Sequence, residues 1–433
     1  MSPPLETGAE GARVAEFWRT ARSVIPPGHL DAAGCNVPSD RVIDEVEAHL
    51  RLERERGGYR AVPDLTACRQ ALAALVGAGP GDVAFLESGT AAMAALLGGW
   101  RLPQGARIGC ARTEYGSTLM LLHRLAVRHG WCLVELPVDG SSRIDPDGLR
   151  ARLAAGLDLV IVSHVGSHSG IVQPVHDLGK LCRAAGVPYV LDVCQSLGHV
   201  EVRGAGADAY VGTSRKWLAG PRGVGFLIIP ALTATPPPAT TMDAPAPTLG
   251  GHTWTLGTGT RGNGTLGNGT LGTGTFGPEP SSDGEGALWA ELSSQVGEPV
   301  PVPGAARYES AESAVAARVG LGVAVLEHQA LGPSDVHAHL ARLGRTTREL
   351  LDGAGGWRVV EPYDEPSALV TLRPPPGDTA ERAAARAAEA SLLVGVVPTA
   401  RAPLDLREPV LRVSPPPGTP VDTLHALARV LAS

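Results

Sequence analysis

The chain has 433 residues, of which 43% are hydrophobic and 19% charged, a balance typical of a soluble globular protein with a sizeable core. The net charge of −7 and the lack of a basic block argue against nucleic-acid binding and against attachment to a membrane surface. The first residues lack the features of a signal peptide, and the apolar runs are too short to span a bilayer. The six cysteines form no CxxC pair, so we expect reduced thiols in a cytoplasmic enzyme.

In chain order, three helical patterns come first, at residues 10–22, 38–55 and 64–76. Short apolar runs then alternate with helical stretches, and we predict seven strands, at 83–86, 107–110, 131–136, 157–162, 188–193, 208–211 and 223–229. Strands that alternate with helices indicate a mostly parallel sheet with helices on both faces, an α/β fold. Ligands bind such sheets at the carboxyl ends of the strands, so functional residues are expected just after strands.

The composition changes between residues 232 and 300, which are rich in Pro, Gly and Thr and contain Gly-Thr repeats. Such a segment buries little apolar area, so we predict a largely disordered insertion. Helical patterns over about 309–330 and 335–352 follow, and then an alternating tail. We therefore expect three units: a helical segment at 1–60 that completes the small domain, a large domain at 61–305, and a linking helix with a small C-terminal α+β domain at 306–433.

The strongest chemical signal is Lys216, which follows a predicted strand in the run Gly-Thr-Ser-Arg-Lys-Trp and lies 24 positions after Asp192. Pyridoxal 5′-phosphate (PLP) requires such a pair, because a lysine amine joins its aldehyde and a carboxylate keeps its pyridine nitrogen protonated. Read singly, Asp192 could cap a helix and Lys216 could be a solvated surface lysine. Together with Gln195 and the Gly-Pro-Arg-Gly turn at 220–223, they predict a PLP site whose catalytic residue is Lys216.

With these motifs, the segment 83–230 resembles the class V, fold-type I family of PLP enzymes, which includes cysteine desulfurases, kynureninase and related lyases. The resemblance implies a large domain with a mostly parallel seven-stranded sheet flanked by helices, and a smaller C-terminal α+β domain. It also implies that Asp192 contacts the pyridine nitrogen and Gln195 the ring hydroxyl. The family's Ser-x-His-Lys is Thr-Ser-Arg-Lys here, which implies that Thr213 and Arg215 hold the phosphate. An arginine can form two parallel hydrogen bonds to a phosphate and so binds it more strongly than the family's histidine.

A second cofactor element is the run Glu-Ser-Gly-Thr at residues 87–90, between a predicted strand and a predicted helix. Backbone amides at a helix N-terminus can cradle a phosphate, although the same run is also an ordinary helix cap. Its position matches the family's phosphate loop, which implies that Gly89 and Thr90 bind the phosphate.

Two positions depart from the family's pattern around the pyridine ring. Tyr115 stands where the family has a histidine that stacks on the ring, so the resemblance implies stacking, and a tyrosine packed at a helix start is the alternative. Ser167 stands where the family has an asparagine near the ring hydroxyl. His164 and His168 in the same loop are spaced as an i,i+4 pair, but on a loop this spacing does not predict a metal site.

The run Leu-Arg-Val-Ser at 411–414 resembles the family's Arg-x-Ser, which implies that Arg412 binds the α-carboxylate of an amino-acid substrate. A solvated arginine at a strand edge is the alternative. Glu312 stands where the family's threonine reaches the partner subunit's phosphate, a contact that an anion cannot make. Fold-type I sites are usually built at a subunit interface, so we expect a homodimer by analogy.

Within the family, several segments are similar to the C–S lyases of the actinobacterial ergothioneine pathway: 57–59, 114–116, 167–170 with 173–174, 195–199, 214–217 with 220–225, and 309–312. The implied reaction is β-elimination from hercynylcysteine sulfoxide, which yields ergothioneine, pyruvate and ammonia. In it Lys216 takes the α-proton, and Tyr59 and Arg401 contact the substrate. A class V aminotransferase or another cysteine-conjugate lyase remains an alternative. A desulfurase is disfavoured because residues 397–403 hold no nucleophilic cysteine, and a non-catalytic PLP-fold protein because Lys216 and Asp192 are both present.

Overall fold

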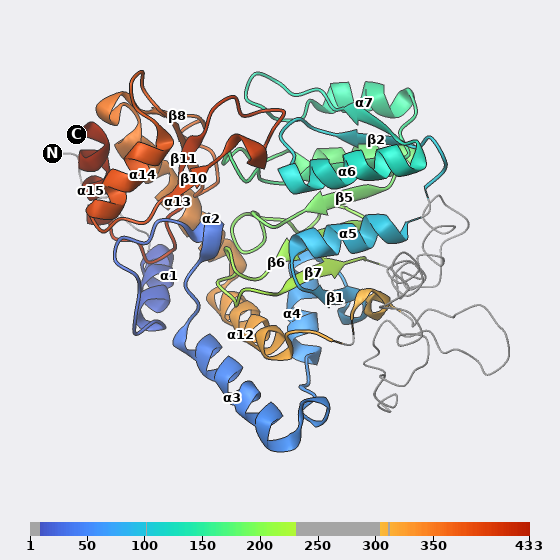
Figure 1. Ribbon diagram of the computed structural model, residues 1–433, viewed down its shortest axis with the longest axis horizontal. Coiled ribbons are helices and arrows are strands. Elements are labelled where there is room, and N and C mark those ends of the chain that lie inside the picture. The colour runs from blue at the N-terminus through green and yellow to red at the C-terminus, as the bar shows by residue number, and fades with distance from the viewer. Residues whose placement is uncertain (1–8, 101, 231–303, 311) are drawn as a thin grey trace.

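The computed structural model describes residues 9–100, 102–230, 304–310 and 312–433 (Figure 1). The insertion predicted at 232–300 lies outside the described residues. The rest forms a large sheet with helices on both faces and, beside it, a smaller sheet with its own helices. No helix in the described ranges is both long and apolar enough to cross a membrane.

The large sheet has seven strands in the order β1-β7-β6-β5-β4-β2-β3. Their bounds are β1 Val83–Leu86, β2 Arg107–Cys110, β3 Cys132–Glu135, β4 Leu159–Ser163, β5 Tyr189–Asp192, β6 Ala209–Thr213 and β7 Gly225–Ile228. Strand β7 runs antiparallel to both its neighbours, and the other pairs are parallel. The predicted mostly parallel seven-stranded sheet is therefore confirmed.

Two apolar cores sandwich this sheet, as the sequence of β4 illustrates. Val160 and Val162 belong to the core on one face, and Leu159 and Ile161 to the core on the other, because successive side chains of a strand point to opposite faces. The first core includes residues of α4 (Thr66–Val76), α7 (Pro146–Ala154), α8 (Val175–Ala185) and α12 (Val315–Leu331), and the second includes residues of α5 (Gly89–Gly99) and α6 (Gly116–His129).

The smaller sheet is antiparallel, in the order β10-β11-β9-β8. Its strands are β8 Arg358–Val359, β9 Val370–Arg373, β10 Gly395–Val397 and β11 Val410–Val413, and its helices are α13 Pro333–Leu351, α14 Ala380–Glu389 and α15 Val421–Ala432. From the N-terminal region, α1 (Ala9–Thr20) and residues Leu30, Ala32 and Ala33 join this core, whereas α3 (Asp40–Arg56) packs on α12. The division into units at residues 60 and 305 stays a prediction.

One helix begins later than its sequence pattern suggests. The predicted helix at 309–330 starts at Val315. Glu309 explains the delay, because its carboxylate accepts a hydrogen bond from the backbone N–H of Phe85 at 2.8 Å and lies 2.8 Å from the Arg69 guanidinium. These contacts tie the residues before α12 to strand β1.

Candidate active site

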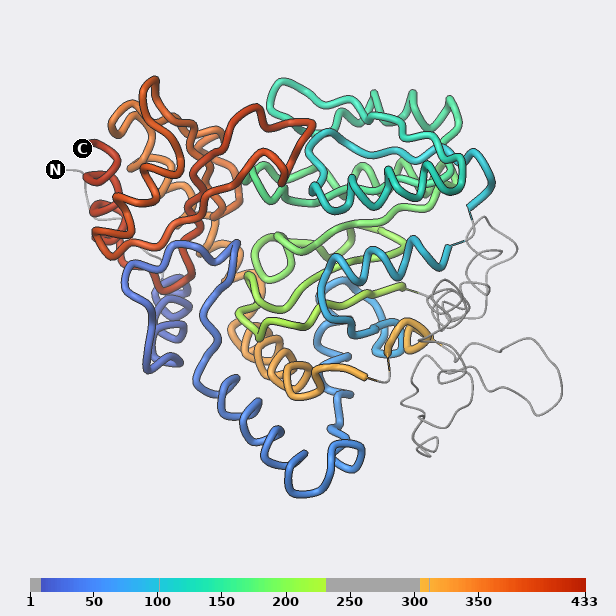
Figure 2. Tube along the Cα trace, in the orientation of Figure 1, coloured from blue at the N-terminus to red at the C-terminus, as the bar shows by residue number. Residues whose placement is uncertain are grey.

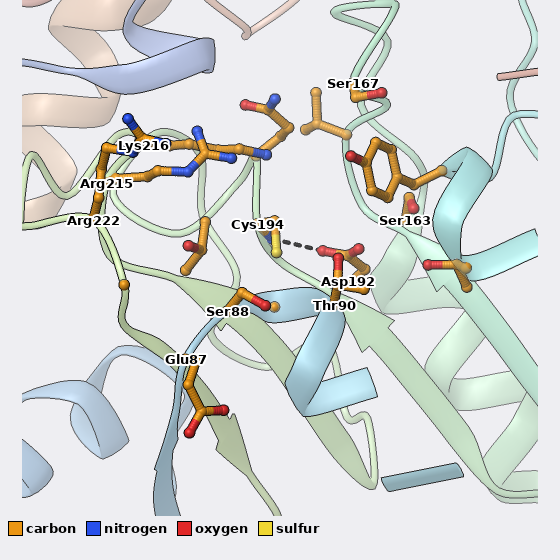
Figure 3. A pocket seen from close by; sticks show the side chains of 17 residues that line it. Glu87, Ser88, Thr90, Ser163, Ser167, Asp192, Cys194, Arg215, Lys216 and Arg222 are labelled. Atoms are coloured by element: carbon orange, nitrogen blue, oxygen red, sulfur yellow. Dashed lines mark hydrogen bonds between the residues drawn. The ribbon is translucent and has the colours of Figure 1, made fainter. Parts of the chain in front are cut away.

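The residues singled out from the sequence converge at one edge of the large sheet. The loops that follow β1, β2, β4, β5 and β6 all reach this edge, because these strands point the same way. They surround a cavity of about 250 Å³ (Figure 3). Nine predicted site residues line it: Gly89, Thr90, Tyr115, Ser167, Asp192, Gln195, Thr213, Arg215 and Lys216.

Lys216 and Asp192 enter this cavity from adjacent strands. Asp192 ends β5, is 9% exposed, and its Oδ1 accepts a hydrogen bond from the backbone N–H of Cys194 at 2.8 Å. Lys216 follows β6, and burial lowers the pKa of its amine to about 8. A larger neutral fraction results, and the neutral amine is the form that attacks an aldehyde.

The chain contains only two lysines, and they differ sharply in setting. Lys180 lies on α8 with a side chain that is 75% exposed, and its amine is 3.0 Å from Asp177. Lys216 lines the cavity. Any chemistry that needs a lysine amine inside the cavity therefore falls to Lys216.

The start of helix α5 lines part of the cavity. Ser88 caps the helix by accepting a hydrogen bond from the N–H of Ala91 at 3.0 Å, so Gly89 and Thr90 present their backbone to the cavity. Arg215 and Arg222 lie on the opposite wall together with Lys216 (Figure 3). A helix N-terminus faced by two guanidinium groups suits a dianion.

Replacing Gly89 with alanine is expected to lower the melting temperature and weaken PLP retention. A Cβ at Gly89 would lie 2.4 Å from the sulfur of Cys194 and 3.3 Å from the carbonyl oxygen of Gly212. Overpacking of this kind costs about 1–3 kcal/mol. The Gly89→Ala/Cys194→Ala double variant removes the closer contact and should regain most of the stability. Thermal unfolding followed by circular dichroism measures this, and equal melting temperatures for wild type and Gly89→Ala would contradict it.

Gln195 is held in place by two neighbours. Its Oε1 accepts a hydrogen bond from the indole N–H of Trp217 at 3.0 Å, and its Nε2 donates to the carbonyl of Ala33 at 3.1 Å. Trp217 in turn stacks on His199 with ring centroids 3.7 Å apart. One N–H of the amide stays available for a cofactor hydroxyl.

A second carboxyl group, that of Glu114, is fully buried next to Ser163, a residue that lines the cavity. It receives hydrogen bonds from the backbone N–H and the hydroxyl of Ser163, both at 2.7 Å. Burial, with the nearby charge of Asp192, raises the pKa of Glu114 to about 8. Glu114 is therefore mostly protonated at neutral pH.

The Glu114→Gln variant is expected to lose less stability than wild type between pH 7 and pH 9. A carboxyl whose pKa is raised in the folded state stabilises the protein below its unfolded pKa, and this contribution fades as pH rises through about 8. The difference amounts to about 1 kcal/mol over this range. Urea unfolding at the two pH values measures it, and parallel losses in both proteins would refute the assignment.

Two other predicted residues, Arg401 and Arg412, contact residues that line the cavity. Arg401, on the segment between β10 and β11, donates a hydrogen bond to the hydroxyl of Tyr115 at 2.6 Å. Arg412 donates to the carbonyl of Ser167 at 2.9 Å, and the Ser167 hydroxyl is buried without a hydrogen-bond partner in the described part of the chain. These contacts bring the smaller sheet's side of the molecule to the cofactor cavity.

Tyr59 is the one predicted site residue that the structure does not place near the others. It is 71% exposed, and its hydroxyl is 3.4 Å from Glu312, which is also exposed. A contact with substrate in the cavity of the same chain has no support from this position.

The cavity also contains residues that the sequence analysis did not single out as site residues. Cys194 and Arg222 line it, and Asp31 pairs with Arg412. The first two lie within motifs already recognised, between Asp192 and Gln195 and in the Gly-Pro-Arg-Gly turn, so their positions could have been found. Burial raises the pKa of the Cys194 thiol, so this group is not a ready nucleophile.

The donor set fits PLP. A buried amine, a carboxylate on the next strand, a helix N-terminus with no room for a Cβ at Gly89, and an unpartnered buried hydroxyl at Ser167 match its aldehyde, ring nitrogen, phosphate and ring hydroxyl. No cluster of three or more metal-binding side chains occurs among residues 9–100, 102–230, 304–310 and 312–433.

Comparison with known proteins agrees with this geometry. Residues 40–243 match the class V aminotransferase family. A probable hercynylcysteine sulfoxide lyase from Mycobacterium tuberculosis (strain CDC 1551 / Oshkosh) is 34% identical over 98% of this chain and 94% of its own length.

Solved structures share the fold. The apo structure of a cysteine desulfurase from Thermococcus onnurineus NA1 has a TM-score of 0.74 at 19% identity, and covers 96% of this chain and 97% of its own. A variant of the enzyme C-DES with glycine covalently linked to its PLP cofactor has a TM-score of 0.71 at 19% identity. The match covers 94% of this chain and 96% of the C-DES chain. The chain belongs to the class V aminotransferase family of PLP-dependent enzymes.

Proposed function

We propose that this enzyme is a carbon–sulfur β-lyase that cleaves hercynylcysteine sulfoxide to ergothioneine, pyruvate and ammonia. The observation that carries the proposal is the similarity to a probable hercynylcysteine sulfoxide lyase, which extends over 98% of the chain and so includes both sheets. Cysteine desulfurases are also relatives, but no cysteine follows Cys194 here, so a persulfide cannot form on the segment that carries Arg401.

Lys216, Asp192 and Arg412 each have a separate task in this proposal. PLP, when bound, withdraws electrons from the substrate's α-carbon. Lys216 accepts the proton from that carbon, a role for which an amine pKa of about 8 is well placed. Asp192 keeps the ring nitrogen protonated. Arg412 holds the α-carboxylate, and so aims the α-proton at Lys216.

The leaving group departs toward the cavity mouth. Loss of the α-proton and cleavage of the Cβ–S bond release the sulfur on the imidazole as a sulfenic acid. The three-carbon fragment takes up water to give pyruvate and ammonia. Two molecules of an added thiol reduce the sulfenic acid to ergothioneine; they leave as a disulfide, and the sulfenic oxygen leaves as water. Arg401, held by the Tyr115 hydroxyl at 2.6 Å, supplies positive charge for the substrate's distal carboxylate or sulfoxide oxygen.

We further propose that the enzyme is a cytoplasmic homodimer. The analogy with fold-type I enzymes supports the dimer. The exposed pair of Tyr59 and Glu312 lies outside the cavity of its own chain, a position from which Tyr59 could contact a partner's substrate. Sedimentation analysis of the PLP-loaded protein tests the dimer.

Turnover of hercynylcysteine sulfoxide by the PLP-loaded enzyme with a thiol reductant tests the reaction. We expect pyruvate and ergothioneine in equal amounts. Pyruvate from L-cysteine or cystine alone, without turnover of the sulfoxide, would instead indicate another cysteine-conjugate lyase. Accumulation of the pyridoxamine form, reversed by a keto acid, would indicate an aminotransferase.

A further inference from the structure

A short segment near the N-terminus, residues 31–36, packs against residues that line the active-site cavity. It includes the one-turn helix α2 (Ala32–Cys35) and runs beside the end of β11 (Figures 1 and 2). Its backbone contacts two residues of the cavity: the Ala33 carbonyl accepts from Gln195, and the Asn36 N–H donates to the Arg215 carbonyl at 2.8 Å. The Gly34 carbonyl accepts a further hydrogen bond from the Arg215 guanidinium.

The side chain of Asp31 links this segment to Arg412. Its Oδ1 accepts a hydrogen bond from a terminal nitrogen of Arg412 at 2.9 Å, and the two side chains are only 24% and 11% exposed. The backbone beside Asp31 is fixed, because Ala32 donates to the Ser414 carbonyl at 2.9 Å and Ala33 to the Ser414 hydroxyl at 3.0 Å.

Two glycines leave room for the Asp31 carboxylate. A Cβ at Gly34 would lie 2.0 Å from its Oδ2, and a Cβ at Gly395 would lie 3.0 Å from its Oδ1. The backbone at these two glycines therefore lies close to the carboxylate and restricts its movement on two sides. With both side chains mostly buried, this ion pair is more restrained than one on the open surface.

The Arg412 guanidinium has N–H groups left over to bind a ligand. One terminal nitrogen of Arg412 donates to Asp31 and the other to the Ser167 carbonyl, while Nε is buried with no partner among the described residues. Each terminal nitrogen carries two N–H groups, so one N–H on each has no partner within the described ranges. Two N–H groups on neighbouring nitrogens are what a carboxylate takes in a forked pair.

We propose that Asp31 is a positioning residue, which holds the Arg412 guanidinium so that its two free terminal N–H groups face the substrate's α-carboxylate. This inference rests on the role proposed above for Arg412. An arginine fixed before the substrate arrives loses less conformational freedom on binding, so affinity for the carboxylate rises. If Asp31 merely competed for Arg412, its removal would tighten carboxylate binding instead.

Titration of the PLP-loaded enzyme with two small amines, followed by the change in cofactor absorbance, tests this. Glycine carries a carboxylate and methylamine does not. In Asp31→Asn, which keeps the shape of the side chain, we expect the Kd for glycine to rise about tenfold, the effect of losing one charge-assisted hydrogen bond. The Kd for methylamine should stay within about twofold of wild type.

The matched control is Asp335→Asn, which breaks an exposed ion pair with Arg13 at 2.7 Å and should change neither Kd. Equal weakening of glycine and methylamine binding would assign Asp31 a general structural role, and tighter glycine binding would make it a competitor; either result overturns the proposal. Arg412→Gln tests the role proposed for Arg412 separately from the role proposed for Asp31. Unchanged glycine binding in that variant would refute the role of Arg412 itself, whatever Asp31→Asn shows.

Discussion

Lys216→Ala should abolish lyase activity and the visible absorbance of lysine-bound PLP, while the protein still folds. The amine is the group that joins the cofactor and the base that takes the α-proton, so two steps fail together. General-base removal alone costs about 10²–10⁴-fold in rate, and loss of the covalent anchor adds to this. The amine makes no structural ion pair in the described chain, so thermal unfolding should change little.

The second lysine provides a matched control. Lys180→Ala removes an exposed amine next to Asp177 and should leave both the absorbance and the rate unchanged. Borohydride reduction of the PLP-loaded enzyme, followed by peptide mapping, should place the cofactor on residues 214–218 alone. Cofactor attached to Lys180 after reduction, or a visible band retained by Lys216→Ala, would refute the assignment.

The parts of this site that could be predicted are those with a local signal. Asp192 ends one buried apolar strand and Lys216 follows the next. Because the two strands are parallel neighbours, their carboxyl ends lie side by side, so residues 24 positions apart in the chain come together. The central strands were predictable because buried strands such as β4 are continuous apolar runs between turn residues, whereas β3, at the edge of the sheet, is largely exposed.

The parts that could not be predicted depend on contacts between distant segments. Asp31 and Arg412 are 381 positions apart, and no pattern around Asp31 sets it apart from other acidic residues. Helix α12 begins at Val315 because Glu309 is bound to β1, a contact that periodicity does not encode. Tyr59 was assigned by resemblance, and its exposed position depends on where the end of α3 lies relative to the cavity.

Asp192→Asn should keep the fold and bind PLP, yet lower the rate of β-elimination by about 10²–10³-fold, the usual cost of removing one electrostatic stabiliser. Asparagine has nearly the same shape, and its side-chain oxygen can still accept the hydrogen bond from the Cys194 N–H, which is 2.8 Å long in the wild type. A neutral amide cannot hold a proton on the pyridine nitrogen, so negative charge at the substrate's α-carbon loses its main acceptor.

The measurement that isolates this effect is exchange of the α-proton of bound substrate with deuterated solvent, compared with pyruvate formation. Both rates should fall together in Asp192→Asn, because proton removal itself is impaired. The Glu114→Gln variant is the matched control. It changes the neighbouring carboxyl, which is mostly protonated at neutral pH, and should retain a rate near that of wild type. Normal exchange with slow pyruvate release in Asp192→Asn would place Asp192 at C–S cleavage, and an unchanged rate would remove it from the chemistry.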